Sequence, residues 1–200
     1  MTANIEYVVF DLGGVLIELD GPPVSTLDSN LSEQQVWQQW LDSTAVRRFE
    51  SGACSPVEFA QSLIDEFCLN QTPETFLQYF EMWPKGVYPG ADQLLITLGQ
   101  RVRLACLSNT NQLHWKRFST TNGLFEHFDQ VFASFQTGHM KPDSKAFEHA
   151  LSELDVGAGE ILFLDDNIAN IESARATGMC AELTRGPIEA ALHLKRYGLL

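Results

Sequence analysis

Basic residues are scarce in this chain. Its 200 residues include 13 Lys and Arg against 26 Asp and Glu, which gives a formal charge of -13 at pH 7. Nucleic acids and anionic membranes are bound through clustered Lys and Arg side chains, so this balance argues against both as partners. It also raises a question about any small anionic substrate, because the chain as a whole repels it.

Long apolar runs and paired cysteines are missing as well. No run approaches the roughly 18 consecutive apolar residues of a membrane span. The N-terminal sequence MTANIEYVVFD lacks a basic start followed by a long apolar region, so we expect no secretory signal. The four cysteines form no Cys-x-x-Cys pair, which disfavours a zinc site or a disulfide framework. We therefore expect buried free thiols and a cytoplasmic protein; the cysteines are Cys54, Cys68, Cys106 and Cys180.

The residues that are present describe one globular α/β domain with an insertion. Apolar residues make up 44% of the chain and charged residues 20%, as in folded soluble proteins. Helical periods separate several short apolar runs, which predicts a parallel sheet with helices on both faces. The expected strands cover residues 5–10, 102–107, 131–133, 161–164 and 180–183, and the clearest helical stripes cover 91–98 and 146–154.

Residues 20–86 break this alternation. They contain no convincing strand but several helix starts. Ser55-Pro56-Val57-Glu58 is a capping box with proline at the first helical position, and Thr72-Pro73 opens another helix. The sequence therefore predicts an all-helical insertion at 20–86 within a core made of 1–19 and 87–200.

Polar residues follow four of the expected strands. In open parallel sheets, ligands bind beyond the carboxyl ends of the strands, so these residues should meet in one crevice. A carboxylate can attack phosphorus, carboxylates and carbonyls are the ligands that Mg²⁺ prefers, and hydroxyl, amide and ammonium groups can stabilise the transferred phosphoryl group. The residues are Asp11, Ser108 with Asn109, Lys141, and Asp165 with Asp166.

Each of these elements also has an ordinary structural interpretation. Asp11 could be a turn residue, Ser108 and Asn109 could cap a helix that begins near Asn111, and Lys141 could be a solvated loop lysine. The adjacent Asp165 and Asp166 are harder to dismiss, because buried neighbouring carboxylates are costly without a cation. The order and placement of all four elements favour phosphoryl transfer.

The four motifs resemble those of the haloacid dehalogenase-like hydrolases, over essentially the whole chain. They read Asp-Leu-Gly-Gly-Val-Leu, Leu-Ser-Asn-Thr-Asn, Lys-Pro-Asp and Phe-Leu-Asp-Asp-Asn, from residues 11, 107, 141 and 163. The resemblance implies a Rossmann-like core, and the helical insertion lies where one branch of phosphatases carries a helical cap. Leu-Ser-Asn-Thr-Asn together with Asp-Asp-Asn-x-x-Asn-Ile-Glu is similar in particular to bacterial α-D-glucose-1-phosphate phosphatases.

The resemblance also implies a role for each motif residue. By this resemblance, the cofactor of the protein would be Mg²⁺ and its substrate a small phosphorylated metabolite. The resemblance implies no particular oligomeric state. Negative charge at a metal site is what the cation requires, so the acidity of the chain does not exclude a phosphate ester. The implied roles are nucleophile and metal ligand for Asp11, metal ligands for the Gly13 carbonyl and Asp166, phosphate binding for Ser108, Asn109 and Lys141, and orientation of Lys141 and metal-bound water for Asp165 and Asn170.

One departure concerns the general acid. Most phosphatases of this kind carry a second aspartate two residues after the nucleophile, where this chain has Gly13. A positioned acid accelerates the reaction by about 10²- to 10⁴-fold, which corresponds to lowering the activation free energy by roughly 3–5 kcal/mol. We therefore expect a leaving group that needs little help, such as the anomeric oxygen of glucose 1-phosphate. His114 is the best alternative donor by position, although a helix-packing histidine is the commoner situation.

Two other functions are alternatives to the phosphatase. Dehalogenases of this superfamily also lack the second aspartate, but they use no Mg²⁺, whereas Asp165 and Asp166 are present here. A phosphate-binding regulator without turnover is the non-enzymatic alternative.

Residues 20–86 carry 10 acids and 3 bases. Arg47 and Arg48 could therefore bind the substrate from the cap or simply end a solvated helix. We expect Trp37, Trp40 and Trp83 to form the core of the cap.

Overall fold

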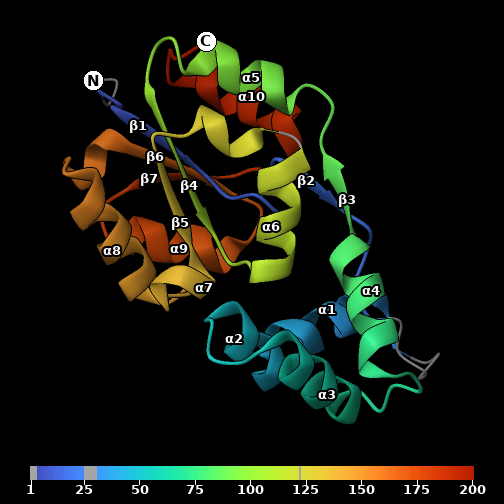
Figure 1. The fold of residues 1–200 in the computed structure, drawn as a ribbon. Coiled ribbons are helices and arrows are strands. Elements are labelled where there is room, and N and C mark those ends of the chain that lie inside the picture. The colour runs from blue at the N-terminus through green and yellow to red at the C-terminus, as the bar shows by residue number, and fades with distance from the viewer. Residues whose placement is uncertain (1–3, 25–30, 122) are drawn as a thin grey trace.

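The computed structural model describes residues 4–24, 31–121 and 123–200. A parallel five-stranded sheet in the order β5-β4-β1-β6-β7 forms its centre (Figure 1). The chain runs outward on one side of β1 and returns to the other side, so the strand order reverses between β1 and β6. The fold class expected from the sequence is confirmed. The strands are β1 (Tyr7–Phe10), β4 (Arg103–Ser108), β5 (Gln130–Ala133), β6 (Ile161–Asp165) and β7 (Cys180–Leu183).

Both faces of the sheet are buried under helices. In β1, Val8 and Phe10 point into one apolar cluster, whereas Tyr7 and Val9 point into the other. This period of two follows from the pleat of the strand, and burial on both faces explains why the strands are continuous apolar runs. α5 (Ala91–Leu98) and α10 (Gly186–Arg196) cover the first face, and α8 (Ser144–Leu154) and α9 (Ile168–Ala176) cover the second (Figure 1).

Shorter elements complete the core near the carboxyl ends of β4 and β5. α6 (Gln112–Thr121) follows β4, and the Asn111 side chain caps it by accepting hydrogen bonds from the backbone N–H groups of Leu113 and His114. The cap residue of this helix is thus Asn111 rather than Ser108 or Asn109. The remaining core elements are α7 (Ser134–Thr137) and the 3-10 turns η1 (Leu124–His127) and η2 (Ala158–Glu160).

Four helices follow one another between β2 and β3 and form a separate lobe (Figure 1). The predicted capping box holds: Ser55 accepts a hydrogen bond from the Glu58 backbone, and the Glu58 side chain accepts one from the Ser55 backbone. Stacked aromatic rings fill the lobe, with Phe49 lying 4.2 Å from Phe59. The helices are α1 (Glu33–Asp42), α2 (Thr44–Glu50), α3 (Pro56–Glu66) and α4 (Pro73–Met82).

The structure corrects two expectations. β3 (Pro84–Val87) begins inside the segment for which no strand was expected, and it pairs antiparallel with β2 (Ile17–Leu19). Its sequence, Pro-Lys-Gly-Val, has low strand propensity, so the strand depends on its distant partner. The cysteines are free thiols, but Cys68 is exposed and only Cys106 is fully buried. Among the described residues, no helix is long and apolar enough to cross a membrane.

Candidate active site

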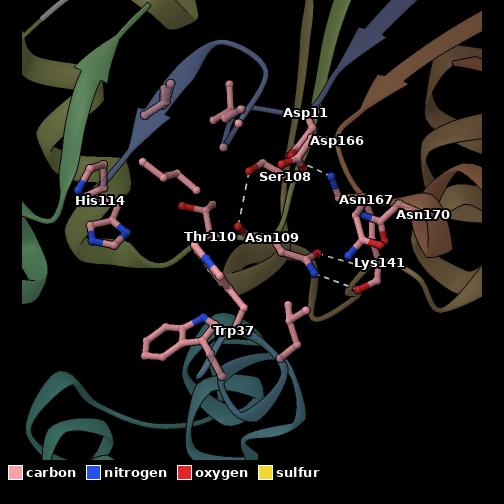
Figure 2. A pocket seen from close by; sticks show the side chains of 18 of the residues that line it. Asp11, Trp37, Ser108, Asn109, Thr110, His114, Lys141, Asp166, Asn167 and Asn170 are labelled. Atoms are coloured by element: carbon pink, nitrogen blue, oxygen red, sulfur yellow. Dashed lines mark hydrogen bonds and ion pairs between the residues drawn. The ribbon is translucent and has the colours of Figure 1, made fainter. Parts of the chain in front are cut away.

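The polar residues that follow the strands meet at one end of the sheet. Asp11 and Asp166 lie beyond β1 and β6, where the strand order reverses, and Ser108 lies beside them (Figure 2). They line a cavity of about 850 Å³ between the sheet and the helical lobe, together with Asn109, Lys141 and Asn170. Gly13 also lines it. The structure therefore brings the motif residues expected at the site into one cavity, at the place where open α/β sheets bind ligands.

Lys141 is held between two carboxylates. Its Nζ lies 2.8 Å from Asp11 Oδ1 and 2.6 Å from Asp165 Oδ2. Burial lowers the pKa of Lys141, but the charges of Asp11 and Asp165 raise it by more, so the net pKa lies above its ordinary value. The ammonium group is therefore charged and fixed beside the Asp11 carboxylate.

Asp165 is fully buried and both of its oxygens accept hydrogen bonds from the protein. Oδ1 accepts from the Asn167 backbone and from Asn170, and Oδ2 accepts from Lys141 and again from Asn170. Because both of its oxygens are bonded within the protein, Asp165 can orient Lys141 but has no unbonded oxygen left for a ligand. Asp11 and Asp166, in contrast, line the cavity with their carboxylates.

The carboxylates also form a cluster suited to a metal ion. One oxygen each from Asp11, Asp165 and Asp166 lies within 4.8 Å of the others. Burial raises the pKa of Asp11 to about 7 and that of Asp166 to about 6, and the negative charge of Asp165 adds to both. The cluster is thus short of positive charge. A divalent cation bound by Asp11 and Asp166 would supply it, and the oxygen donors fit Mg²⁺.

Gly14 is required by the geometry of the turn after Asp11. Its φ of +72° is in the left-handed region, and a Cβ there would lie 2.2 Å from Asp166 Oδ2. Any other residue at this position would displace the Asp166 carboxylate from the cluster. The Gly-Gly pair in the first motif therefore lets the β1 turn approach the end of β6.

Ser108 and Asn109 differ in what their side chains do. Within the described residues, the Ser108 hydroxyl makes only a long 3.4 Å hydrogen bond, to the Asn109 carbonyl, so it can donate to a ligand instead. The Asn109 amide donates to the Lys141 carbonyl at 2.8 Å, and its oxygen accepts from the Lys141 backbone at 2.9 Å. Asn109 thus anchors the loop that carries Lys141, a contact that the sequence alone did not indicate.

The helical lobe contributes aromatic rings and two acids, Glu33 and Glu50, to the cavity. Trp37, Trp40 and Trp83 pack together in the lobe, as expected, but all three also line the cavity. Arg47 and Arg48 are not among the lining residues: Arg47 forms an ion pair with Asp143 of the core.

Glu50, at the end of the same helix, does line the cavity. Glu50 is not among the residues that the sequence predicts for the site. Its sequence signals are its place beside Arg47 and Arg48, which could bind the substrate from the cap, and its place just before the turn that leads to the next helix start at Ser55. From the sequence alone, an acid at such a position cannot be distinguished from any other acid at a helix end.

His114 is buried under the lobe as a packing residue. Its Nε2 donates to the Phe80 carbonyl at 2.7 Å, and its Nδ1 accepts from Asn111 Nδ2 at 3.0 Å. Burial lowers the pKa of His114 to about 4, and the Arg117 charge adds to this effect while the Phe80 carbonyl opposes it. Both ring nitrogens are therefore engaged, and the ring is neutral near pH 7.

Comparison with known proteins agrees with this geometry. A model of the haloacid dehalogenase-like hydrolase family matches residues 5–178. The chain belongs to this family. Among similar members, a sesquiterpene phosphatase from Aspergillus oryzae is 29% identical over 90% of this chain and 89% of its own. A D-ribitol-5-phosphate phosphatase from Bacteroides thetaiotaomicron is 26% identical, with coverage of 87% and 89%.

A solved structure of another haloacid dehalogenase family enzyme supports the fold. The magnesium complex of an enzyme from Bacteroides thetaiotaomicron superposes with a TM-score of 0.79 and 22% identity, covering 96% of this chain and 99% of that chain. The parallel sheet and the inserted helices of this chain are thus those of a haloacid dehalogenase-like hydrolase.

Proposed function

We propose that this hydrolase is a Mg²⁺-dependent phosphatase that cleaves a small phosphate monoester through an aspartyl phosphate on Asp11. The observation that carries the proposal is the Lys141 ammonium, 2.8 Å from Asp11 and 2.6 Å from Asp165 in the cavity that Asp166 also lines. This arrangement holds a carboxylate nucleophile next to a fixed positive charge. Both curated relatives described above are named as phosphatases, which supports the reaction class.

The residues of the chain divide the chemistry between them. An oxygen of Asp11 attacks phosphorus, and the bond from phosphorus to the ester oxygen breaks. Lys141 neutralises charge on the phosphoryl oxygens, and the Ser108 hydroxyl donates a hydrogen bond to them. Asp165 and Asn170 keep Lys141 in place, and water then hydrolyses the aspartyl phosphate. Asp11, the Gly13 carbonyl and Asp166 would hold Mg²⁺, which would supply the positive charge that lets an anion approach a dianionic phosphate.

We put sugar and sugar-alcohol phosphates first as substrates. The B. thetaiotaomicron relative is named for ribitol 5-phosphate, and Gly13 in place of an acid favours the anomeric oxygen of glucose 1-phosphate. The phosphate of an apolar alcohol is the second candidate, because Trp37 and Trp83 line the cavity and the A. oryzae relative is named for sesquiterpenes. In either case, residues 20–86 would act as the cap that selects the leaving group over a core of 1–19 and 87–200.

Phosphate release from a substrate panel tests the proposal. The panel contains glucose 1-phosphate, glucose 6-phosphate, ribitol 5-phosphate, flavin mononucleotide, a nucleotide and farnesyl monophosphate, each with Mg²⁺ and with EDTA. We expect turnover that requires Mg²⁺ and is abolished in Asp11→Asn. Turnover that survives Asp11→Asn, or none on any ester, would overturn the proposal. A higher kcat/KM for glucose 6-phosphate than for glucose 1-phosphate would refute only the anomeric preference.

The same experiment separates the alternatives. Chloride release from 2-chloropropionate without Mg²⁺ would indicate a carbon–halogen hydrolase instead. Binding of Mg²⁺ and phosphate without turnover would indicate a regulator. The cytoplasmic location stays a prediction from the sequence and the unpaired thiols.

A further inference from the structure

The leaving oxygen of an ordinary phosphate ester needs a proton, and Gly13 cannot provide one. Two of the cavity's other proton-bearing groups are engaged elsewhere. His114 uses both ring nitrogens in hydrogen bonds to Phe80 and Asn111, and Lys141 is bound by two carboxylates. Glu50 lines the same cavity from the cap side. Its position makes it a candidate proton donor for the site.

The backbone at Glu50 is fixed against the core. Its carbonyl accepts a hydrogen bond of 2.6 Å from the hydroxyl of Ser134, which follows β5. The preceding residue, Phe49, is stacked on Phe59 inside the cap. Two residues later, Gly52 lies so close to the Phe135 carbonyl that a Cβ would be 2.3 Å from its oxygen. Contacts to both the cap and the core thus hold this turn in place.

The Glu50 side chain is partly buried. No residue in the described part of the chain donates a hydrogen bond to its carboxylate or forms an ion pair with it. The core charges that act on it are Asp11 and Lys141, while on its own helix Arg47 is paired with Asp143 and Arg48 is exposed. Burial raises the pKa of Glu50 to about 7, and the charge of Asp11 adds to the rise while Lys141 opposes it.

We propose that Glu50 is the proton donor and acceptor of the phosphatase reaction, in place of the acid that Gly13 lacks. This inference rests on the proposed function. As Asp11 attacks phosphorus, the electron pair of the breaking bond stays on the ester oxygen, and the Glu50 carboxyl transfers its proton there to give the alcohol. The Glu50 carboxylate then takes a proton from the water that attacks the aspartyl phosphate, which restores the acid and releases phosphate from Asp11.

The substrate range follows from this role. With a carboxyl group to protonate the leaving oxygen, the enzyme does not depend on an anomeric phosphate. Esters of primary alcohols, such as ribitol 5-phosphate, become substrates of the same site. The proton donor is on the cap, so it reaches the reacting bond only while the cap is docked on the core.

The test compares two leaving groups in Glu50→Gln. For glucose 6-phosphate, whose alkoxide needs a proton, we expect kcat/KM, which reports the steps up to departure of the alcohol, to fall about 10²- to 10⁴-fold. For p-nitrophenyl phosphate, whose leaving group is stable as an anion, we expect kcat/KM to fall about tenfold or less, although loss of the base lowers kcat for both esters. Retained turnover of p-nitrophenyl phosphate also shows that the variant is folded. The matched control is Glu81→Gln, which changes an exposed acid of the cap that does not line the cavity and should alter neither kcat/KM.

Equal losses of kcat/KM on both esters, or no loss on glucose 6-phosphate, would overturn the role of Glu50 while leaving the phosphatase assignment intact. Wild-type protein that turns over no ester of the substrate panel, nor p-nitrophenyl phosphate, with Mg²⁺ would overturn the proposed function and this inference with it. Glu50→Asp adds a second readout, because it retains a carboxyl group. We expect it to recover part of the glucose 6-phosphate activity that Glu50→Gln loses.

Discussion

His114 should make the stability of this protein fall at mildly acidic pH. The ring is 7% exposed and packs 4.4 Å from the Phe80 ring, between α6 and the cap. The Phe80 carbonyl can only accept, so Nε2 carries the proton and Nδ1 accepts from Asn111. A second proton on Nδ1 would face the Asn111 amide group and place a charge in an apolar pocket.

The sign and size of the effect follow from the two pKa values. The histidine pKa is 6.5 in the unfolded chain and about 4 in the folded protein. Between these values the unfolded chain binds a proton that the folded state does not, so the free energy of unfolding decreases as pH falls through this window. At pH 5 this amounts to about 2 kcal/mol, and below pH 4 to about 3 kcal/mol.

Urea unfolding at pH 7 and pH 5, for the wild type and for His114→Gln, measures this contribution. A glutamine amide can still donate to the Phe80 carbonyl but does not titrate. The raised pKa values of Asp11, Glu50 and Asp166 act in the opposite sense, and they cancel when the two proteins are compared.

Between pH 7 and pH 5, we expect the wild type to lose about 2 kcal/mol more than the variant. An equal change in both proteins would refute the reasoning. The variant should also keep the alkaline limb of the pH–rate profile, since a histidine with both nitrogens engaged is no proton donor.

Three further outcomes test other parts of the structure. Gly52→Ala should destabilise the protein by about 1–3 kcal/mol, because φ is +74° and the new Cβ would meet the Phe135 carbonyl; an unchanged melting temperature would contradict this. Arg47→Ala should cost less than about 1 kcal/mol in urea unfolding, because its ion pair with Asp143 has side chains 58% and 50% exposed. An increased KM in that variant would instead indicate substrate contact. EDTA should abolish phosphate release and added Mg²⁺ should restore it; turnover that persists in EDTA would exclude a metal held by the carboxylate cluster.

The core of the site could be predicted because each motif residue follows a buried strand. Runs such as Ile161–Leu164 are apolar throughout, so the polar residues after them stand out, and the parallel sheet brings their ends together. Asp11, Lys141 and Asp165 therefore meet although long stretches of sequence separate them. The meeting of these residues could be predicted from where the strands end, whereas their individual roles came from the resemblance to the family.

Features set by contacts between the cap and the core could not be predicted in the same way. Glu50 resembles any acid at a helix end until the turn at Gly52 is docked on α7. The motif indicates Asn109 as a phosphate ligand but does not indicate that its amide group also bonds the Lys141 backbone. β3 forms because it pairs with β2, from which the whole cap segment separates it in the sequence. Each of these contacts depends on partners distant in sequence, which local patterns do not reveal.

The paired strands β2 and β3 form the connection between the cap and the core. The chain leaves the core through β2 and returns through β3, and Lys85 ties the paired strands together through Glu18 and Asp20. A rotation about this pair of strands would carry Trp37 and Glu50 by the same angle. With Glu50 as the proton donor proposed above, the rings that line the cavity and the carboxyl that protonates the leaving oxygen would reach a ligand together. Recognition and proton supply would then depend on the same position of the cap.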